Sequence, residues 1–187
     1  CDRKKMVVAY GGAITTALCF FVFCVSLDSI EAEEADTSST VVLPTPSYSG
    51  EKSLEEVIYS RKSVRNFSTE PLTIQQISQL LWAAGGKTVD GVSGATRSYP
   101  SAGGIYPLEI YLFSGEVDTI PAGVYRYIWE HHRLDRIISG DKRQELMNES
   151  RGQYSALSAP VILVITAHYE QTVSRYGERG EQRYVPI

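Results

Sequence analysis

The chain has 187 residues, of which 43% are hydrophobic and 21% charged, with 18 basic and 22 acidic side chains and a formal net charge of -4. This composition predicts a folded globular domain, because a disordered chain would hold fewer apolar residues. It excludes a dedicated nucleic-acid binder, which would normally carry a basic surplus. It also excludes a disulfide scaffold, because the chain has only three cysteines.

The N-terminal segment, residues 1–27, is predicted to be a membrane anchor or a signal segment. Residues 6–27 carry no charge and follow Arg3, Lys4 and Lys5. As a helix they would be roughly 30 Å long, enough to cross a bilayer. The basic flank before them and the acidic flank after them predict a membrane-anchored domain outside the cytoplasm, or a secreted or periplasmic one if the segment is cleaved. A buried core helix is the third interpretation.

Residues 28–50 are predicted to be a linker. The segment is first acidic, then rich in Ser and Thr, and ends with Pro44, Pro46 and Gly50. Such a composition does not bury enough apolar surface to fold by itself.

From residue 51 to 187 the pattern predicts one globular domain that begins with two helices. Ser53 and Glu56 form a capping box that starts a helix over 54–61. Thr73 and Gln76 form a second capping box, and Gly85 is expected to stop that helix. The apolar stripe of the second helix consists of Ile74, Ile77, Leu80, Leu81 and Ala84.

The rest of the chain predicts strands interrupted by loops and one helix. The expected elements are a long loop (86–104), a strand (108–113), a hairpin (123–129 and 133–138), a helix (141–150) and a buried strand (160–168). Helices and strands in this order indicate a mixed α/β or α+β layered fold.

The first candidate site lies at the end of the first helix. It spans residues 60–65 and holds three cations, Arg61, Lys62 and Arg65, and two hydroxyls, Ser60 and Ser63. Arg supplies planar paired donors, Lys a point charge and Ser a short donor, which together suit a phosphate. The alternative is a solvated basic patch that only complements the helix C-terminus.

The second candidate site lies before the strand at 108–113. It spans residues 97–107, Arg97-Ser98-Tyr99-Pro100-Ser101-Ala102-Gly103-Gly104-Ile105-Tyr106-Pro107. Small residues let the backbone approach a flat ligand closely, with backbone N–H groups free to bond its heteroatoms. The alternative is an ordinary Gly-rich turn.

The histidines of the hairpin do not predict a metal site. His131 and His132 are adjacent at the predicted tip, and adjacent side chains in a strand setting point apart. His168, at the end of the buried strand, is expected to be a structural residue or to lie at the rim of a site.

The two candidate segments together carry a resemblance. The sequences SRKSVRNF (60–67) and RSYPSAGGIYPLEIYLF (97–113) resemble the flavin-dependent nitroreductase superfamily. The resemblance is closest to its SagB-type (thiazole/oxazole dehydrogenase-like) branch and covers residues 43–187. It implies an α+β, nitroreductase-like fold with a central mixed, mostly antiparallel sheet flanked by helices.

The resemblance also implies site residues and a cofactor. Arg61, Lys62, Ser63 and Arg65 would bind the phosphate and ribityl end of FMN. Pro100, Ser101, Ala102 and Gly103 would line the isoalloxazine ring, usually from the partner subunit of a homodimer. No catalytic side chain is predicted, because the flavin performs the chemistry.

The implied activity is an FMN-dependent oxidoreductase. It would transfer two electrons between NAD(P)H, another donor or an azoline-like substrate and an acceptor, with small-molecule or peptide-derived substrates. A non-catalytic flavin-binding or interaction module of the same fold is the alternative, and an unrelated α/β hydrolase or transferase is the third.

Both ends of the sequence predict a longer protein. Cys1 is not Met, and family members continue past the equivalent of Val185 into a further helix, a turn and a strand. We therefore expect the domain over 51–187 to be C-terminally incomplete, with FMN binding and activity of the chain alone in doubt.

Overall fold

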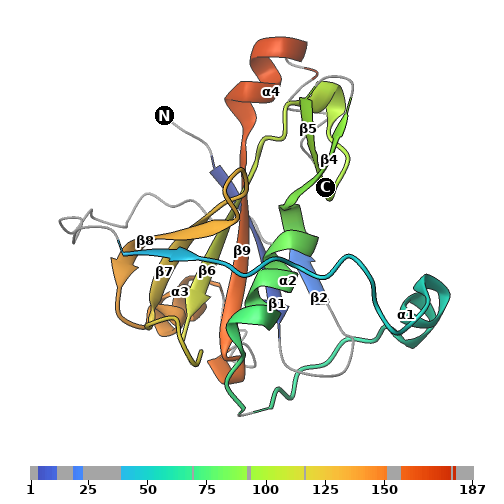
Figure 1. Ribbon diagram of the computed structural model, residues 1–187. Helices are drawn as coiled ribbons and strands as arrows, with labels where there is room; N and C mark the ends of the chain where they lie inside the picture. Colours follow the sequence, from blue (N-terminus) through green and yellow to red (C-terminus); the bar gives the residue numbers. More distant parts are fainter. Residues whose placement is uncertain are drawn as a thin grey trace.

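The computed structural model describes residues 4–11, 19–22, 39–68, 70–91, 94–115, 117–150, 157–177 and 179. Its main element is a sheet in the order β2-β1-β9-β6-β7-β8-β3, in which neighbouring strands pair antiparallel (Figure 1). The strands are β1 (Lys4–Gly11), β2 (Cys19–Val22), β3 (Thr40–Val42), β6 (Leu108–Ser114), β7 (Gly123–Ile128), β8 (Arg133–Ser139) and β9 (Val161–His168). The helices are α1 (Leu54–Ser60), α2 (Ile74–Gly85), α3 (Arg143–Glu149), α4 (Tyr169–Tyr176) and a 3-10 turn, η1 (Ala102–Gly104).

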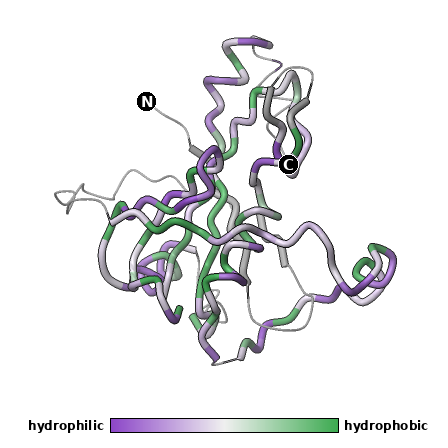
Figure 2. The backbone as a smooth tube through the Cα atoms, viewed as in Figure 1, coloured by the Kyte–Doolittle hydropathy of each residue, from purple (hydrophilic) through white to green (hydrophobic). Residues whose placement is uncertain are grey.

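Strand β9 forms the centre of the sheet. It pairs with β1 on one side and with β6 on the other. Seven consecutive residues, from Val161 to Ala167, are buried, and the strand end His168 is partly exposed. This confirms the buried strand that the apolar run predicts, and Figure 2 shows hydrophobic positions gathered along the central strands.

Helices α2 and α3 cover the sheet on opposite faces. Ile77 and Leu81 of α2 belong to the main core, together with inward residues of β6, β7, β8 and β9. Leu146 and Met147 of α3 pack instead against Ile162 and Val164 of β9. Because successive side chains of a strand point to opposite faces, β9 contributes to both layers.

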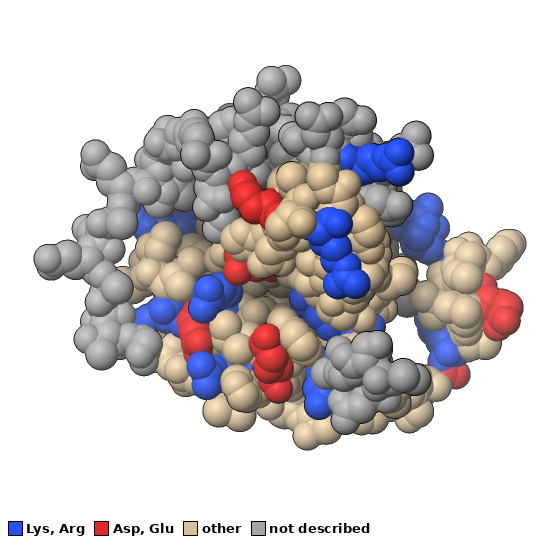
Figure 3. Space-filling view, turned by 90° about the horizontal axis from the view of Figure 1, so that it is seen from above, with Lys and Arg blue, Asp and Glu red and all other residues tan. Residues whose placement is uncertain are grey.

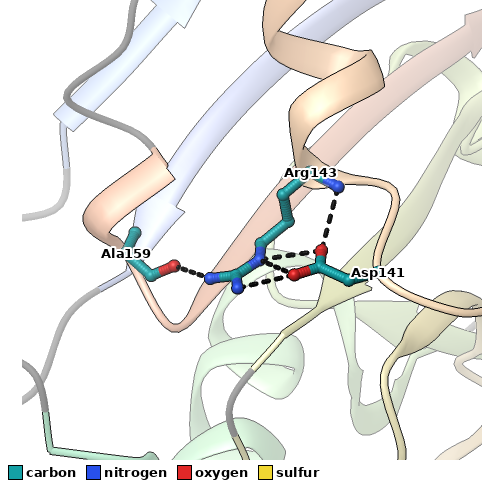
Figure 4. A network of polar contacts seen from close by, with 3 residues as sticks. All are labelled: Asp141, Arg143 and Ala159. Carbon is teal, nitrogen blue, oxygen red and sulfur yellow. Dashed lines mark hydrogen bonds and ion pairs between the residues drawn. The ribbon is translucent and has the colours of Figure 1, made fainter.

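The start of α3 is fixed by one arginine (Figure 4). Arg143 forms an ion pair with Asp141, with Nη2 2.7 Å from Oδ2, and donates to the carbonyl of Ala159 just before β9. The hydrogen bonds from Arg143 lower the pKa of Asp141. The contact ties the loop after β8 to the loop before β9.

Both predicted capping boxes are present. Ser53 and Glu56 exchange reciprocal bonds at the start of α1, and Thr73 and Gln76 do so at the start of α2. Gly85 differs from its prediction, because it is the last residue of α2 and Gly86 is the C-cap. Gly85 is buried against the side chains of Arg97 and Ile110, which leave no room for a Cβ at this position.

Helix α1 projects away from the body of the molecule (Figures 1 and 3). Its apolar side chains Leu54, Ile58 and Tyr59 are 70%, 65% and 93% exposed. The helix therefore presents an apolar surface that the described part of this chain does not cover.

The predicted loop over 86–104 contains a second, two-stranded sheet. Strands β4 (Lys87–Gly91) and β5 (Gly94–Arg97) pair antiparallel. Thr88 Oγ1 lies 2.8 Å from Thr96 Oγ1 across the pair, and Thr96 also donates to the carbonyl of Val89. The prediction of a loop was wrong because it rested on the Gly content of the segment. Its β-branched residues favour the strands that the structure shows.

The N-terminal segment also differs from its prediction. Within residues 6–27, the described parts belong to strands β1 and β2, which extend the sheet beyond β9. The predicted spanning helix is therefore not found there, and the rest of the segment lies outside the described residues. None of the helices in the described ranges is long and apolar enough to cross a membrane.

The predicted linker overlaps the fold at its C-terminal end. Strand β3 pairs with β8, Leu43 is buried, and the carbonyl of Pro44 accepts a bond from Ser78 of α2. Residues 28–38 lie outside the described part of the chain.

Candidate functional site

The basic segment that follows α1 is on the surface. The backbone N–H of Arg61 caps the helix by donating to the carbonyl of Ile58. The side chains of Arg61, Lys62, Ser63 and Arg65 are all exposed. They form a continuous set of cationic and hydroxyl donors that an anion can reach from solvent.

The second candidate segment folds into a tight turn. Gly103 and Gly104 both have left-handed backbone, with φ of 62° and 66°. The N–H of Gly104 donates to the carbonyl of Ser101, and the N–H of Tyr106 donates to Ser101 Oγ at 2.9 Å. A Cβ on Gly103 would collide with the Tyr176 hydroxyl, whereas one on Gly104 would meet open space. Gly104 therefore leaves an uncrowded backbone surface on this turn.

Beside this turn the main sheet splits. Strand β6 pairs with β9 from Leu108 onward, and β7 pairs with β8 as far as Ile128. The pairing between β6 and β7 begins only at Tyr111 and Arg126. A cavity of about 780 Å³ lies at this split, lined by the start of β6, the end of β7 and the residues just before β6.

Two polar side chains hold Glu109 in place in the cavity. Glu109 Oε2 lies 2.9 Å from His168 Nε2 and accepts a bond from the Tyr111 hydroxyl at 2.7 Å. Burial, and then the bond to Glu109, raise the pKa of Tyr111 well above its usual value. His168 thus lies at the rim of the cavity.

Arg97 is the most buried charged side chain at the cavity. It is 6% exposed, and its Nε and Nη1 donate to the carbonyls of Gly85 at 2.7 Å and Leu108 at 3.0 Å. Its guanidinium lies 4.9 Å from the ring centroid of Tyr99 and 5.2 Å from that of Trp129. Burial lowers the pKa of Arg97, but a guanidinium stays charged in proteins.

His132 has a structural role outside the cavity. Its Nδ1 lies 2.8 Å from the Tyr127 hydroxyl, and its Nε2 lies 2.7 Å from Ser78 Oγ and 3.1 Å from the Pro44 carbonyl. Burial lowers its pKa. The ring therefore joins the hairpin to α2 and to the segment after β3.

The structure does not place the two predicted site segments around one cavity. The residues that the resemblance assigns to the cofactor, 61–63, 65 and 100–103, are not among the described residues that line the split, whereas five others of the second segment are: Arg97, Gly104, Ile105, Tyr106 and Pro107. Sequence reasoning placed Arg97 at the start of the second candidate segment but gave it no role of its own. It missed Glu109 and Trp129.

A match to the family model covers most of this architecture. The model of the nitroreductase family matches residues 58–185, a range that includes the basic segment, the Gly-rich turn and the split sheet. The chain belongs to the nitroreductase family.

Individual nitroreductase relatives agree. A protein of Methanocaldococcus jannaschii with the provisional name of nitroreductase is 41% identical over 71% of this chain. A nitroreductase-like structure from Ralstonia eutropha JMP134 superposes with a TM-score of 0.62 and 31% identity over 76% of this chain. The Escherichia coli microcin synthetase McbBCD complex, solved with truncated pro-MccB17 bound, matches 87% of this chain with a TM-score of 0.50 and 26% identity.

The nitroreductase fold predicted from the two motifs is therefore confirmed, with an antiparallel main sheet flanked by helices. The chain spans 65% of the length of the archaeal relative and 62% of each of the two solved structures.

The residues present fit a flavin mononucleotide. The exposed donors of Arg61, Lys62 and Ser63 have the chemistry that a phosphate needs. The open backbone at Gly104 lets a flat ring approach the second segment.

Proposed function

We propose that this chain is part of an FMN-dependent oxidoreductase. The observation that supports the proposal most strongly is the presence, in a nitroreductase-family chain, of both an exposed cationic segment and a left-handed turn at Gly103 and Gly104 that is open at Gly104. FMN, when bound, supplies hydride chemistry that no side chain of this chain can provide.

In this proposal each segment has one task. Arg61, Lys62, Ser63 and Arg65 hold the phosphate and ribityl end. Pro100, Ser101, Ala102 and Gly103 present a backbone surface with small side chains to the ring. The chain orients the cofactor and shields it, and no side chain acts as a nucleophile.

The cavity at the split sheet is the proposed place for the donor or the acceptor. Its volume of about 780 Å³ lies in the range of small-molecule sites. Glu109 is fixed by His168 and Tyr111, so its carboxylate has a defined position in the cavity. The donor is proposed to be NAD(P)H or another two-electron carrier.

A peptide-derived substrate, such as an azoline, is the proposed alternative to a free small molecule. Support comes from the similarity to the McbBCD complex, which was solved with truncated pro-MccB17 bound. The SagB-type branch is proposed on the same basis.

The functional unit is proposed to be a homodimer. The exposed apolar residues of α1 are a surface that a second copy can cover. In such a dimer the Gly-rich turn of one subunit can meet the basic segment of the other.

An anaerobic titration tests the proposed activity. The full-length protein is mixed with NADH or NADPH while the flavin absorbance is recorded. Bleaching by a donor and recovery with an acceptor are expected. A bound flavin that no donor bleaches would instead support the non-catalytic module.

A further inference from the structure

Arg97 joins parts of the fold that are far apart in the sequence. Its Nε donates to the carbonyl of Gly85 at the end of α2, and its Nη1 donates to the carbonyl of Leu108 at the start of β6. Leu108 lies where β6 has no pairing with β7, so the guanidinium supplies a donor at the split. The ring of Trp129, just after β7, lies against the same group, with its centroid 5.2 Å from the guanidinium carbon.

The guanidinium also contacts both flanks of the Gly-rich turn. Tyr99 precedes the turn and Tyr106 follows it, with ring centroids 4.9 Å and 5.9 Å from the Arg97 guanidinium carbon. The two rings pack edge to face at 5.6 Å. The backbone N–H of Arg97 lies 3.4 Å from the Tyr106 hydroxyl.

Tyr106 needs such support. Its φ of 51° is left-handed, a conformation that a bulky side chain adopts only where its surroundings enforce it. The Tyr106 ring packs beside Arg97, and the backbone N–H of Tyr106 donates to Ser101 Oγ. Tyr106 is therefore held through both its side chain and its backbone. The turn between Tyr99 and Tyr106 therefore depends on what holds the two rings.

The chemistry at this position requires arginine. A buried cation is costly unless its donors are satisfied, and no carboxylate in the described part of the chain pairs with Arg97. Its donors meet carbonyls in two directions while its flat face meets aromatic rings. An ammonium group has neither the planar fork nor the flat face.

We propose that Arg97 is a positioning residue for the flavin: it clamps Tyr99 and Tyr106, and so holds Pro100–Gly103 in the conformation that lines the ring. This inference rests on the proposed function. It assigns Arg97 no contact with the flavin and no step in the reaction.

The test compares Arg97→Lys with Arg143→Lys in the full-length protein. Arg143 is a matched control, because it is also largely buried and also donates to a carbonyl, but it lies at the start of α3. The measurements are FMN affinity by fluorescence quenching, the visible circular dichroism of bound FMN, and amide hydrogen exchange at Gly104 and Tyr106 without flavin.

We expect Arg97→Lys to weaken FMN binding at least tenfold, to alter the visible dichroism and to speed exchange at both amides at least tenfold. Arg143→Lys should change unfolding but none of these three. Wild-type affinity, dichroism and exchange in folded Arg97→Lys would overturn the inference.

If Arg97→Lys does not fold, Trp129→Leu replaces it, because it removes one wall around the guanidinium and leaves the sequence of the turn unchanged. A threefold or larger loss of FMN affinity supports the inference, and unchanged affinity overturns it. A wild-type protein that binds no FMN would contradict the proposed function, whereas faster exchange in Arg97→Lys would still show that Arg97 orders the turn.

Discussion

Gly85 and Arg97 fit together because residue 85 has no side chain. A Cβ at this position would lie 2.6 Å from Arg97 Nη2 and 2.7 Å from Ile110 Cδ1. The guanidinium therefore occupies the space that any other residue at position 85 would need.

Gly85→Ala should consequently destabilise the protein, although alanine is the better helix former. Overpacking of this kind costs about 1–3 kcal/mol. Urea unfolding monitored by circular dichroism measures the effect, with Gly50→Ala as control, since a Cβ there meets nothing within 4 Å. Equal midpoints for the two variants would show that Arg97 moves aside freely.

Arg61 and Arg65 should control FMN retention. Charge-assisted hydrogen bonds contribute about 1.5–3 kcal/mol each, so Arg61→Ala with Arg65→Ala should weaken FMN binding by about two to four orders of magnitude. Equilibrium dialysis of FMN measures the change. Lys142→Ala removes an exposed cation next to α3 and should bind FMN normally. Normal FMN retention in the double variant would show that Arg61 and Arg65 do not bind the phosphate.

The apolar face of α1 should be needed for dimerisation. Ile58→Glu puts a charge on this surface and should shift the full-length protein to monomers, measured by light scattering after size exclusion. Val89→Glu is the control, because Val89 is 80% exposed on the β4–β5 hairpin. A dimeric Ile58→Glu variant would place the interface elsewhere.

His132 should make stability fall in mild acid. Burial lowers its folded pKa, so the unfolded chain binds the proton more readily. The contribution of neutral His132 is fully present above its unfolded pKa of about 6.5 and is lost as the pH falls through the lower folded value.

Urea midpoints between pH 8 and pH 5 test this dependence. His132→Asn tolerates the left-handed backbone at φ 47° and should flatten the slope, while losing about 1 kcal/mol for each hydrogen bond that it does not replace. His131→Asn, at an exposed neighbour, should keep the wild-type slope. Identical slopes in all three proteins would exclude His132 as the titrating group.

Local signals explain what the sequence could predict. The capping boxes at Ser53 and Thr73 and the apolar run of β9 need only neighbouring residues to be recognised. The two motifs identified the family for the same reason. An apolar run without clear period does not separate strand from helix, which is why residues 6–27 were expected to be a spanning helix.

The features that could not be predicted depend on distant partners. Arg97 is buried because Gly85 and Trp129 meet around it. His132 is partly buried because Pro44 and Ser78 fold onto its ring. The cavity exists because β6 separates from β7, and no local pattern marks that separation.

The central claim is that the full-length protein containing this chain holds FMN. The most direct measurement is the ratio of released flavin to protein after purification, with the flavin identified by mass. We predict about one FMN per chain and a flavin absorption spectrum before release. A folded, colourless protein that takes up no FMN when the cofactor is added in excess would contradict the account.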